Sequence, residues 1–214
     1  MASTASPYGF RAVNELGGLP YAGSTRQFLI DPAGYNTNIY NGSLVFVNTS
    51  GYINIATATG ADATTNGFPT GTANTGCIGV FVGCSFTNAQ GQIIYSQYYP
   101  ANTAAVQGSA ITAYVIDDDR AVFQVQSAGT VTQAALGANV FLNAVQSTST
   151  GSTTTGNSNT AVVAGASAVT TTAAFRVVGF ADVPGFSTVG DAYTDILVKF
   201  NPGAHSYSNA TGVA

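Results

Sequence analysis

The segment Tyr114–Gln126, Y-V-I-D-D-D-R-A-V-F-Q-V-Q, places three consecutive acids between two apolar stretches. The flanking residues are rich in Val, Ile, Phe and Tyr, side chains that favour β-strands. Asp side chains commonly accept hydrogen bonds from nearby backbone N–H groups in tight turns. We therefore predict a strand over Thr112–Ile116, a hairpin turn at Asp117–Asp119 and a second strand over Ala121–Gln126.

The same three acids could instead form a metal or catalytic site. A calcium loop needs six or more oxygen ligands at set spacing, usually with a glycine at the bend. Consecutive Asp side chains in an extended or turn segment cannot all face one ion, and the next acid, Asp182, lies far along the chain. The turn is the preferred interpretation of Asp117–Asp119, with a weak ion site at a subunit boundary as the alternative.

Short β-forming stretches of this kind recur along the chain, separated by turn residues such as Asn41-Gly42 and Pro184-Gly185. One short helix is predicted over Thr130–Leu136, with Gly137 ending it. The pattern predicts an all-β fold, an antiparallel β-sandwich or β-barrel of about ten short strands. The further strands are expected at Gln27–Ile30, Leu44–Val47, Tyr52–Ala56, Cys77–Cys84, Ile93–Tyr99, Val140–Val145, Phe175–Phe180 and Asp195–Phe200.

Two regions depart from this pattern. Residues 1–26 are rich in glycine and proline and lack strand alternation, which indicates an extended N-terminal arm or a partly disordered terminus. Residues 27–214 are expected to form a single β domain with a long Ser/Thr/Gly-rich loop at 147–172. Because this loop region carries no charge and no proline, part of it could form an edge ribbon that pairs with another chain.

The composition is unusually poor in charge. Asp, Glu, Lys and Arg make up 7% of the chain, against about 25% in typical globular proteins, so much of the surface is neutral and suited to packing against neighbours. Five cations and a net charge of −4 argue against nucleic-acid binding, which depends on Lys and Arg neutralising phosphates. No apolar run is long enough to span a membrane. Cys77 and Cys84 would lie on opposite faces of one strand, unpaired and buried.

The residue types that usually carry catalysis are scarce or isolated. The chain has one histidine, His205, with no nucleophile-elbow pattern and too few Cys and His residues to complete a zinc site. We expect His205 to be packed or solvated, and we expect no enzymatic activity, metal or cofactor. Tyr95, Tyr98 and Tyr99 could form a sugar-binding platform, although such a stripe more often alternates between a core and a protein interface.

A series of motifs occurs in a fixed order over nearly the whole chain. They are S-P-Y-G-F-R-A-V-N-E-L-G-G-L-P-Y-A-G-S-T-R-Q, G-V-F-V-G-C-S-F, Q-Y-Y-P-A-N-T, A-Y-V-I-D-D-D-R-A-V-F-Q-V-Q, T-T-G-N-S-N, F-R-V-V-G-F and D-I-L-V-K-F-N-P-G-A-H-S-Y. Together these motifs resemble a family of small virion proteins of tailed bacteriophages, encoded among the head genes. The resemblance implies a capsid decoration (cement) protein, made in the host cytoplasm, that binds the outer surface of the head and braces it.

This resemblance implies two partners, the major capsid protein and further copies of the same chain. A homotrimer at local threefold positions is expected, with a dimer at twofold positions as the alternative. A tail, fibre or adhesion subunit that binds host-surface carbohydrate is the alternative function. Aromatic and Arg side chains are common interface anchors, and the residues expected to contact the capsid are Tyr8, Phe10, Arg11, Tyr21 and Arg26.

Overall fold

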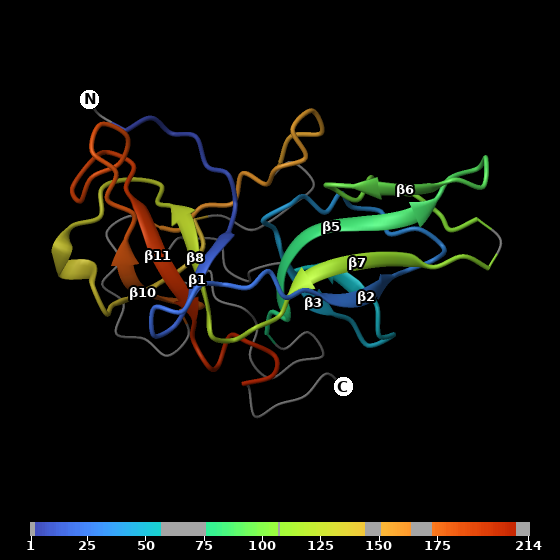
Figure 1. The fold of residues 1–214 in the computed structure, drawn as a ribbon, viewed down its shortest axis with the longest axis horizontal. Helices are drawn as coiled ribbons and strands as arrows, with labels where there is room; N and C mark the ends of the chain where they lie inside the picture. The colour runs from blue at the N-terminus through green and yellow to red at the C-terminus, as the bar shows by residue number, and fades with distance from the viewer. Residues whose placement is uncertain (1–2, 57–75, 107, 144–150, 164–172, 209–214) are drawn as a thin grey trace.

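The computed structural model describes residues 3–56, 76–106, 108–143, 151–163 and 173–208, which form an all-β fold (Figure 1). Its strands belong to two antiparallel sheets that pack together as a β-sandwich, which confirms the predicted fold class. The strands are β1 (Arg11–Glu15), β2 (Arg26–Ile30), β3 (Leu44–Val47), β4 (Ile53–Ile55), β5 (Gly79–Thr87), β6 (Ile93–Ser96), β7 (Ile111–Ile116), β8 (Ala121–Gln126), β9 (Asn139–Val140), β10 (Phe175–Phe180) and β11 (Asp195–Phe200).

The second sheet buries side chains on both of its faces, in two separate clusters. The first sheet has the strand order β1-β8-β11-β10-β9, and the second has β2-β7-β5-β3-β4 with β6 paired to β5. Successive side chains of a strand point to opposite faces, so Leu44 and Val80 enter the cluster between the sheets. Their neighbours Val45 and Phe81 enter a second cluster on the other face of the second sheet. Strands β2 and β4 approach each other, so this sheet curls around its own cluster.

The acidic segment between β7 and β8 is a bend, but it does not close a hairpin. β7 belongs to the second sheet and β8 to the first, so the predicted hairpin is wrong and the segment crosses between the sheets. Asp118 Oδ1 accepts a hydrogen bond from the Arg120 backbone N–H at 2.8 Å, and the Asp118 carbonyl accepts one from Ala121 at 3.2 Å. These local bonds form the tight polar bend that three consecutive acids predict.

The N-terminal region is not an arm outside the β domain. Strand β1 pairs antiparallel with β8, placing Arg11 opposite Gln124 and Glu15 opposite Ala121. Its sequence, R-A-V-N-E, offers one β-branched residue and two charges, so it carries little strand signal of its own. The backbone hydrogen bonds to β8 make this segment a strand although its own residues do not favour one. The expected boundary after residue 26 therefore does not separate an arm from the β domain.

Several predicted elements are shorter than expected, among them the strand predicted at Ile93–Tyr99, which ends at Ser96. The predicted helix Thr130–Leu136 contains one three-residue 3-10 turn, Gln133–Ala135, and Thr132 at its N-cap makes no capping side-chain bond. A helix this short forms too few backbone hydrogen bonds to offset the unfavourable free energy of its nucleation. The predicted strand Val140–Val145 is reduced to the two residues of β9, and residues 144 and 145 lie outside the described residues.

The described part of the Ser/Thr/Gly-rich region is built into the body of the protein. The Asn41 N–H donates to the Gly156 carbonyl at 2.9 Å, and the Ser158 N–H donates to the Asn41 carbonyl at 2.8 Å. Ser158 and Val162 are buried. Residues 151–163 are therefore not a free edge for another chain, and the rest of the predicted loop at 147–172 lies outside the described residues.

Both cysteines are free and buried, as predicted. They do not share one strand, because Cys84 lies in β5 and Cys77 lies two residues before its start. Cys77 lies in the cluster between the sheets, whereas Cys84 lies in the second sheet's own cluster. Burial raises the pKa of each thiol to about 12, which leaves both largely protonated and unreactive near neutral pH.

Candidate interaction surface

Two of the predicted contact residues lie together just before and at the start of β1. The Arg11 guanidinium carbon lies 5.0 Å from the centroid of the Tyr8 ring, a cation–π arrangement. Arg11 is exposed and Tyr8 is half-buried. Burial raises the pKa of the Tyr8 hydroxyl above its usual value, and the nearby Asp195 carboxylate adds to that effect. Tyr8 and Arg11 are therefore positioned as one aromatic–cation unit with Arg11 reaching solvent.

Phe10 cannot contact another protein in this fold, so its prediction as a capsid contact is wrong. Its side chain is 1% exposed and packs in the cluster between the sheets. The Phe10 ring stacks on Phe175 with centroids 4.7 Å apart and meets Phe123 edge-on at 6.4 Å. Phe10 directly precedes β1, and the extended chain there points Phe10 inward and Arg11 outward. The sequence could not reveal this without the strand assignment.

A row of apolar side chains missing from the predicted contacts lies on β1 and the turn that follows it. Val13, Leu16 and Leu19 are large hydrophobic residues that remain exposed. The Glu15 N–H donates to the Leu19 carbonyl at 2.8 Å, so the L-G-G-L segment forms a closed turn that presents both leucines. We call Arg11, Val13, Leu16, Leu19 and Tyr21 the β1-edge surface. The signal in the sequence was two leucines flanking a glycine pair, a pattern that seldom belongs to a core element.

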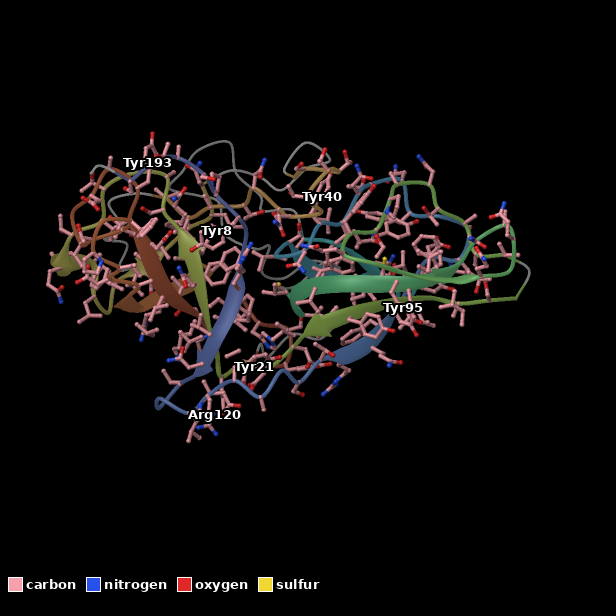
Figure 2. All side chains as sticks on the ribbon, turned by 45° about the horizontal axis from the view of Figure 1, so that its top comes forward. Tyr8, Tyr21, Tyr40, Tyr95, Arg120 and Tyr193 are labelled. Carbon is pink, nitrogen blue, oxygen red and sulfur yellow. The ribbon has the colours of Figure 1, made fainter. Side chains whose placement is uncertain are left out.

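Tyr21 ends the β1-edge surface beside the acidic crossover. Its hydroxyl donates to the Ser24 carbonyl, which fixes the ring on a partly exposed loop. Burial raises the pKa of Tyr21 to about 12, with Asp118 and Asp117 adding to the shift. Figure 2 shows Tyr8 and Tyr21 at opposite ends of β1, with Arg120 beside Tyr21. The predicted contacts Tyr8, Arg11 and Tyr21 thus lie along one side of the first sheet.

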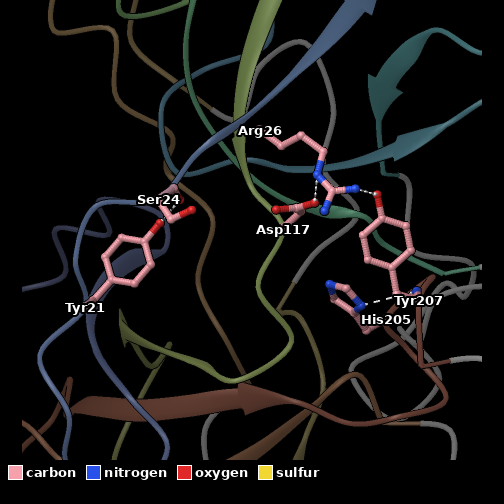
Figure 3. Close-up of polar contacts among 6 residues, drawn as sticks. All are labelled: Tyr21, Ser24, Arg26, Asp117, His205 and Tyr207. Atoms are coloured by element: carbon pink, nitrogen blue, oxygen red, sulfur yellow. Dashed lines mark hydrogen bonds and ion pairs between the residues drawn. The ribbon is translucent and has the colours of Figure 1, made fainter.

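Arg26, the fifth predicted contact, forms polar contacts with other residues of the same chain (Figure 3). Its Nε lies 2.8 Å from Asp117 Oδ2, and its Nη1 donates to the Tyr207 hydroxyl at 2.8 Å. The exposed guanidinium pairs with a largely buried carboxylate. This arrangement ties the start of β2 and the C-terminal segment to the crossover between the sheets. We call Arg26, Asp117, His205 and Tyr207 the junction cluster.

His205 is packed in the junction cluster, at 0% exposure. Its ring meets Phe200 and Tyr207 edge-on, with centroids 5.2 and 5.6 Å away, and its Nδ1 accepts a hydrogen bond from the Tyr207 N–H. A hydroxyl nucleophile needs a hydrogen bond to such a base. Within the described part of the chain neither ring nitrogen has a hydroxyl partner, and Ser208 Oγ donates to Asp119 instead, at 2.8 Å.

We expect the stability of the protein to fall as the pH drops below about 6.5. Burial lowers the pKa of His205, against a smaller opposing effect of Asp119 and Asp117. Above about pH 6.5 the ring is neutral in both states, whereas below it the unfolded chain takes up a proton first. The free energy of unfolding should then decrease by up to about 1.4 kcal/mol per pH unit, until the native pKa is reached.

The check is urea unfolding of the wild type and of His205→Gln between pH 7.5 and 5.5. Because the chain has one histidine, the variant should lose most of this pH dependence whatever its absolute stability. Equal slopes in the two proteins would show that His205 does not titrate in the unfolding reaction.

The three tyrosines considered as a sugar platform point in different directions. Tyr95 is 76% exposed, whereas Tyr99 is fully buried and its hydroxyl donates to the Thr103 carbonyl at 2.8 Å. Tyr98 stacks on Tyr40 with ring centroids 5.6 Å apart. Tyr95 lies on the second sheet (Figure 2). Because Tyr99 is buried and Tyr98 stacks on Tyr40, the three tyrosines do not form one exposed platform.

Comparison of the chain with models of known protein families, with curated proteins and with solved structures yields no match. Among the described residues, no group of three His, Cys, Asp or Glu side chains is arranged to hold a metal ion. No helix within the described ranges is long and apolar enough to cross a membrane. The interpretation of function therefore rests on the chain's own surfaces and on the resemblance drawn from its motifs.

Proposed function

We propose that this protein is a structural virion protein, a capsid decoration protein that binds the outer surface of a phage head and stabilises it. The observation that carries the proposal is the β1-edge surface, where Val13, Leu16 and Leu19 remain exposed and Tyr21 is partly exposed. Exposed apolar side chains that gather on one surface mark protein interaction sites. The scarcity of charge over the whole chain, 7%, suits a protein that works packed against neighbours.

The β1-edge surface offers the features that a capsid partner would use. Leu16 and Leu19 supply apolar contact area, while Arg11 and Tyr21 supply residue types that often dominate interface energies, and Tyr8 lies against Arg11. β1 is the terminal strand of the first sheet among the described residues, and the Glu15–Leu19 backbone hydrogen bond closes the turn that carries both leucines. Arg26 lies outside the β1-edge surface, and its guanidinium pairs with Asp117 and Tyr207 within the chain while staying 60% exposed, so its role as a contact stays a prediction.

We expect Leu19→Asp to weaken binding to undecorated heads by more than about tenfold while leaving the fold intact. Leu19 is 58% exposed, and surface substitutions away from special features change stability by about 0.5 kcal/mol or less. In a complex, the new carboxylate would be buried without a partner. Co-sedimentation of purified protein with undecorated heads over a concentration series measures the affinity.

Phe186→Asp is the matched control, because Phe186 is also exposed, at 78%, but lies between β10 and β11. Equal binding by wild type and Leu19→Asp would remove the β1-edge surface as the contact, whereas no binding by the wild type would remove the decoration proposal.

Deleting residues 1–26 would not test the contact separately from the fold, since the deletion also removes β1 and the buried Phe10. If the wild type binds host glycans instead, the adhesion alternative replaces decoration.

A further inference from the structure

Strand β6 is an unprotected edge of the second sheet. It pairs with β5 and with no other strand among the described residues. Natural edge strands usually carry a charge, a proline or a bulge that discourages pairing with another chain. β6 and the residues beside it read Q-I-I-Y-S-Q, without charge or proline, and its register with β5 runs without a shift. Ile93 and Tyr95 are 66% and 76% exposed.

The turn before β6 determines which backbone groups face outward. The Asn88 N–H donates to the Gln92 carbonyl at 2.9 Å, so Gln92 directs its backbone groups toward β5. In an antiparallel pair this direction alternates from residue to residue. Ile94 and Ser96 therefore bond toward β5, and Ile93 and Tyr95 direct their N–H and C=O groups away from it. Within the described ranges, the two residues whose backbone groups have no partner, Ile93 and Tyr95, are also the two with exposed side chains.

We propose that β6 pairs antiparallel with β6 of a second copy of this chain, which joins two second sheets into one continuous sheet across a twofold axis. The axis passes beside Ile94, so that Ile93 of each copy lies opposite Tyr95 of the other. Each Ile93–Tyr95 pair then exchanges both backbone hydrogen bonds, and Ile94 faces its own counterpart in the non-hydrogen-bonded position.

The strand is complementary to itself in this register. Aromatic and β-branched residues directly opposite each other are a favourable cross-strand pair, and the twofold axis creates that pair twice. Because β6 carries no charge, two copies meet without like-charge repulsion at the contact, although the chain as a whole is negative. A charged partner would find no opposite charge on this strand to bind. The uncharged, self-complementary strand therefore favours a second copy of the chain as the partner.

The inference does not depend on the decoration proposal, because the twofold pair forms in solution without any capsid. It selects a dimer over the trimer expected from the resemblance. A trimer with β6 at its contacts would need a different strand opposite β6, since a threefold contact is heterologous and joins two unlike surfaces.

The first test is sedimentation velocity of the wild type, Tyr95→Lys and Phe186→Lys. We expect a dimer for the wild type and for Phe186→Lys, and a dissociation constant more than about tenfold higher for Tyr95→Lys. Phe186 matches Tyr95 in exposure but lies far from β6 in the chain. A wild type that stays monomeric up to about 1 mM, a trimer, or an unweakened Tyr95→Lys dimer overturns the proposal.

The second test fixes the register by cross-linking. Cα atoms of a non-hydrogen-bonded antiparallel pair lie about 4.5 Å apart, within the range that a disulfide bridges. Ile94→Cys should form a disulfide-linked dimer under mild oxidation, whereas Phe186→Cys should stay monomeric on a non-reducing gel. The two native thiols are buried and should not contribute. No cross-link at position 94 in a protein that still dimerises would place the contact elsewhere.

Discussion

Phe10→Ala should lower the free energy of unfolding by about 3–5 kcal/mol, the range for removing a buried aromatic ring. The Phe10 ring is part of an aromatic cluster between the sheets. In this cluster the ring centroids of Phe175 and Phe200 lie 4.9 Å apart, and those of Phe123 and Phe200 lie 5.6 Å apart. Phe10 is also held by its backbone, since its N–H donates to the Gly42 carbonyl at 3.0 Å.

The position of Phe10 explains why the loss should be large. Gly42 in turn donates to the carbonyl of Phe81 in the second sheet, at 2.8 Å, while the Phe10 ring packs on side chains of the first. Removing the ring leaves a cavity at the contact between the sheets, and the flanking strands restrict how far it can collapse. Both sheets should therefore lose stability together, in one cooperative transition.

Guanidinium or urea unfolding of Phe10→Ala, with Phe186→Ala beside it, measures the effect. The control removes an equally large but exposed ring, so its stability should change by less than about 0.5 kcal/mol. A loss below about 1 kcal/mol for Phe10→Ala would contradict the buried position of the ring. Binding of folded Phe10→Ala to heads should equal that of the wild type, because the ring is not an interface residue.

The sequence predicts the strands well where local pattern and tertiary pairing agree. β3, β8, β10 and β11 occur at the predicted residues because each has β-branched or aromatic side chains on a buried face. β1 was missed because its pairing with β8, and not its own residues, makes it a strand. Which strands pair is a long-range property, and local periodicity does not report it.

The same limit applies to the crossover and to the predicted contacts. Three acids between two strands predict a bend equally well for a hairpin and for a change of sheet, because the local hydrogen bonds of Asp118 are the same in both. Residue type alone made Phe10 and Arg11 look alike as interface anchors. Their separation into core and surface follows from the strand that they enter, which is why one contact prediction failed and its neighbour remains a proposal.

Gly79→Ala should be severely damaging, although Gly79 does not have the left-handed φ angle that usually requires glycine. A Cβ atom at Gly79 would lie 2.0 Å from the Ile116 carbonyl oxygen and 3.0 Å from Asp117 Cα. Both are backbone atoms at the start of the acidic crossover, so no side-chain rotation can relieve the clash. β5 and β7 would have to separate, and we expect a loss of more than about 3 kcal/mol or failure to fold.

Gly179→Ala in β10 is the matched control, since this glycine also lies in a strand and has no left-handed φ angle. Its added Cβ would lie 3.3 Å from Leu197 Cδ1, the end of a side chain that can move, so the change should cost less than about 1 kcal/mol. Soluble yield and thermal unfolding of both variants compare the two sites. If Gly79→Ala is as stable as Gly179→Ala, β5 does not pack against the crossover as closely as the structure has it. The route by which D-D-D-R joins the two sheets would then be wrong.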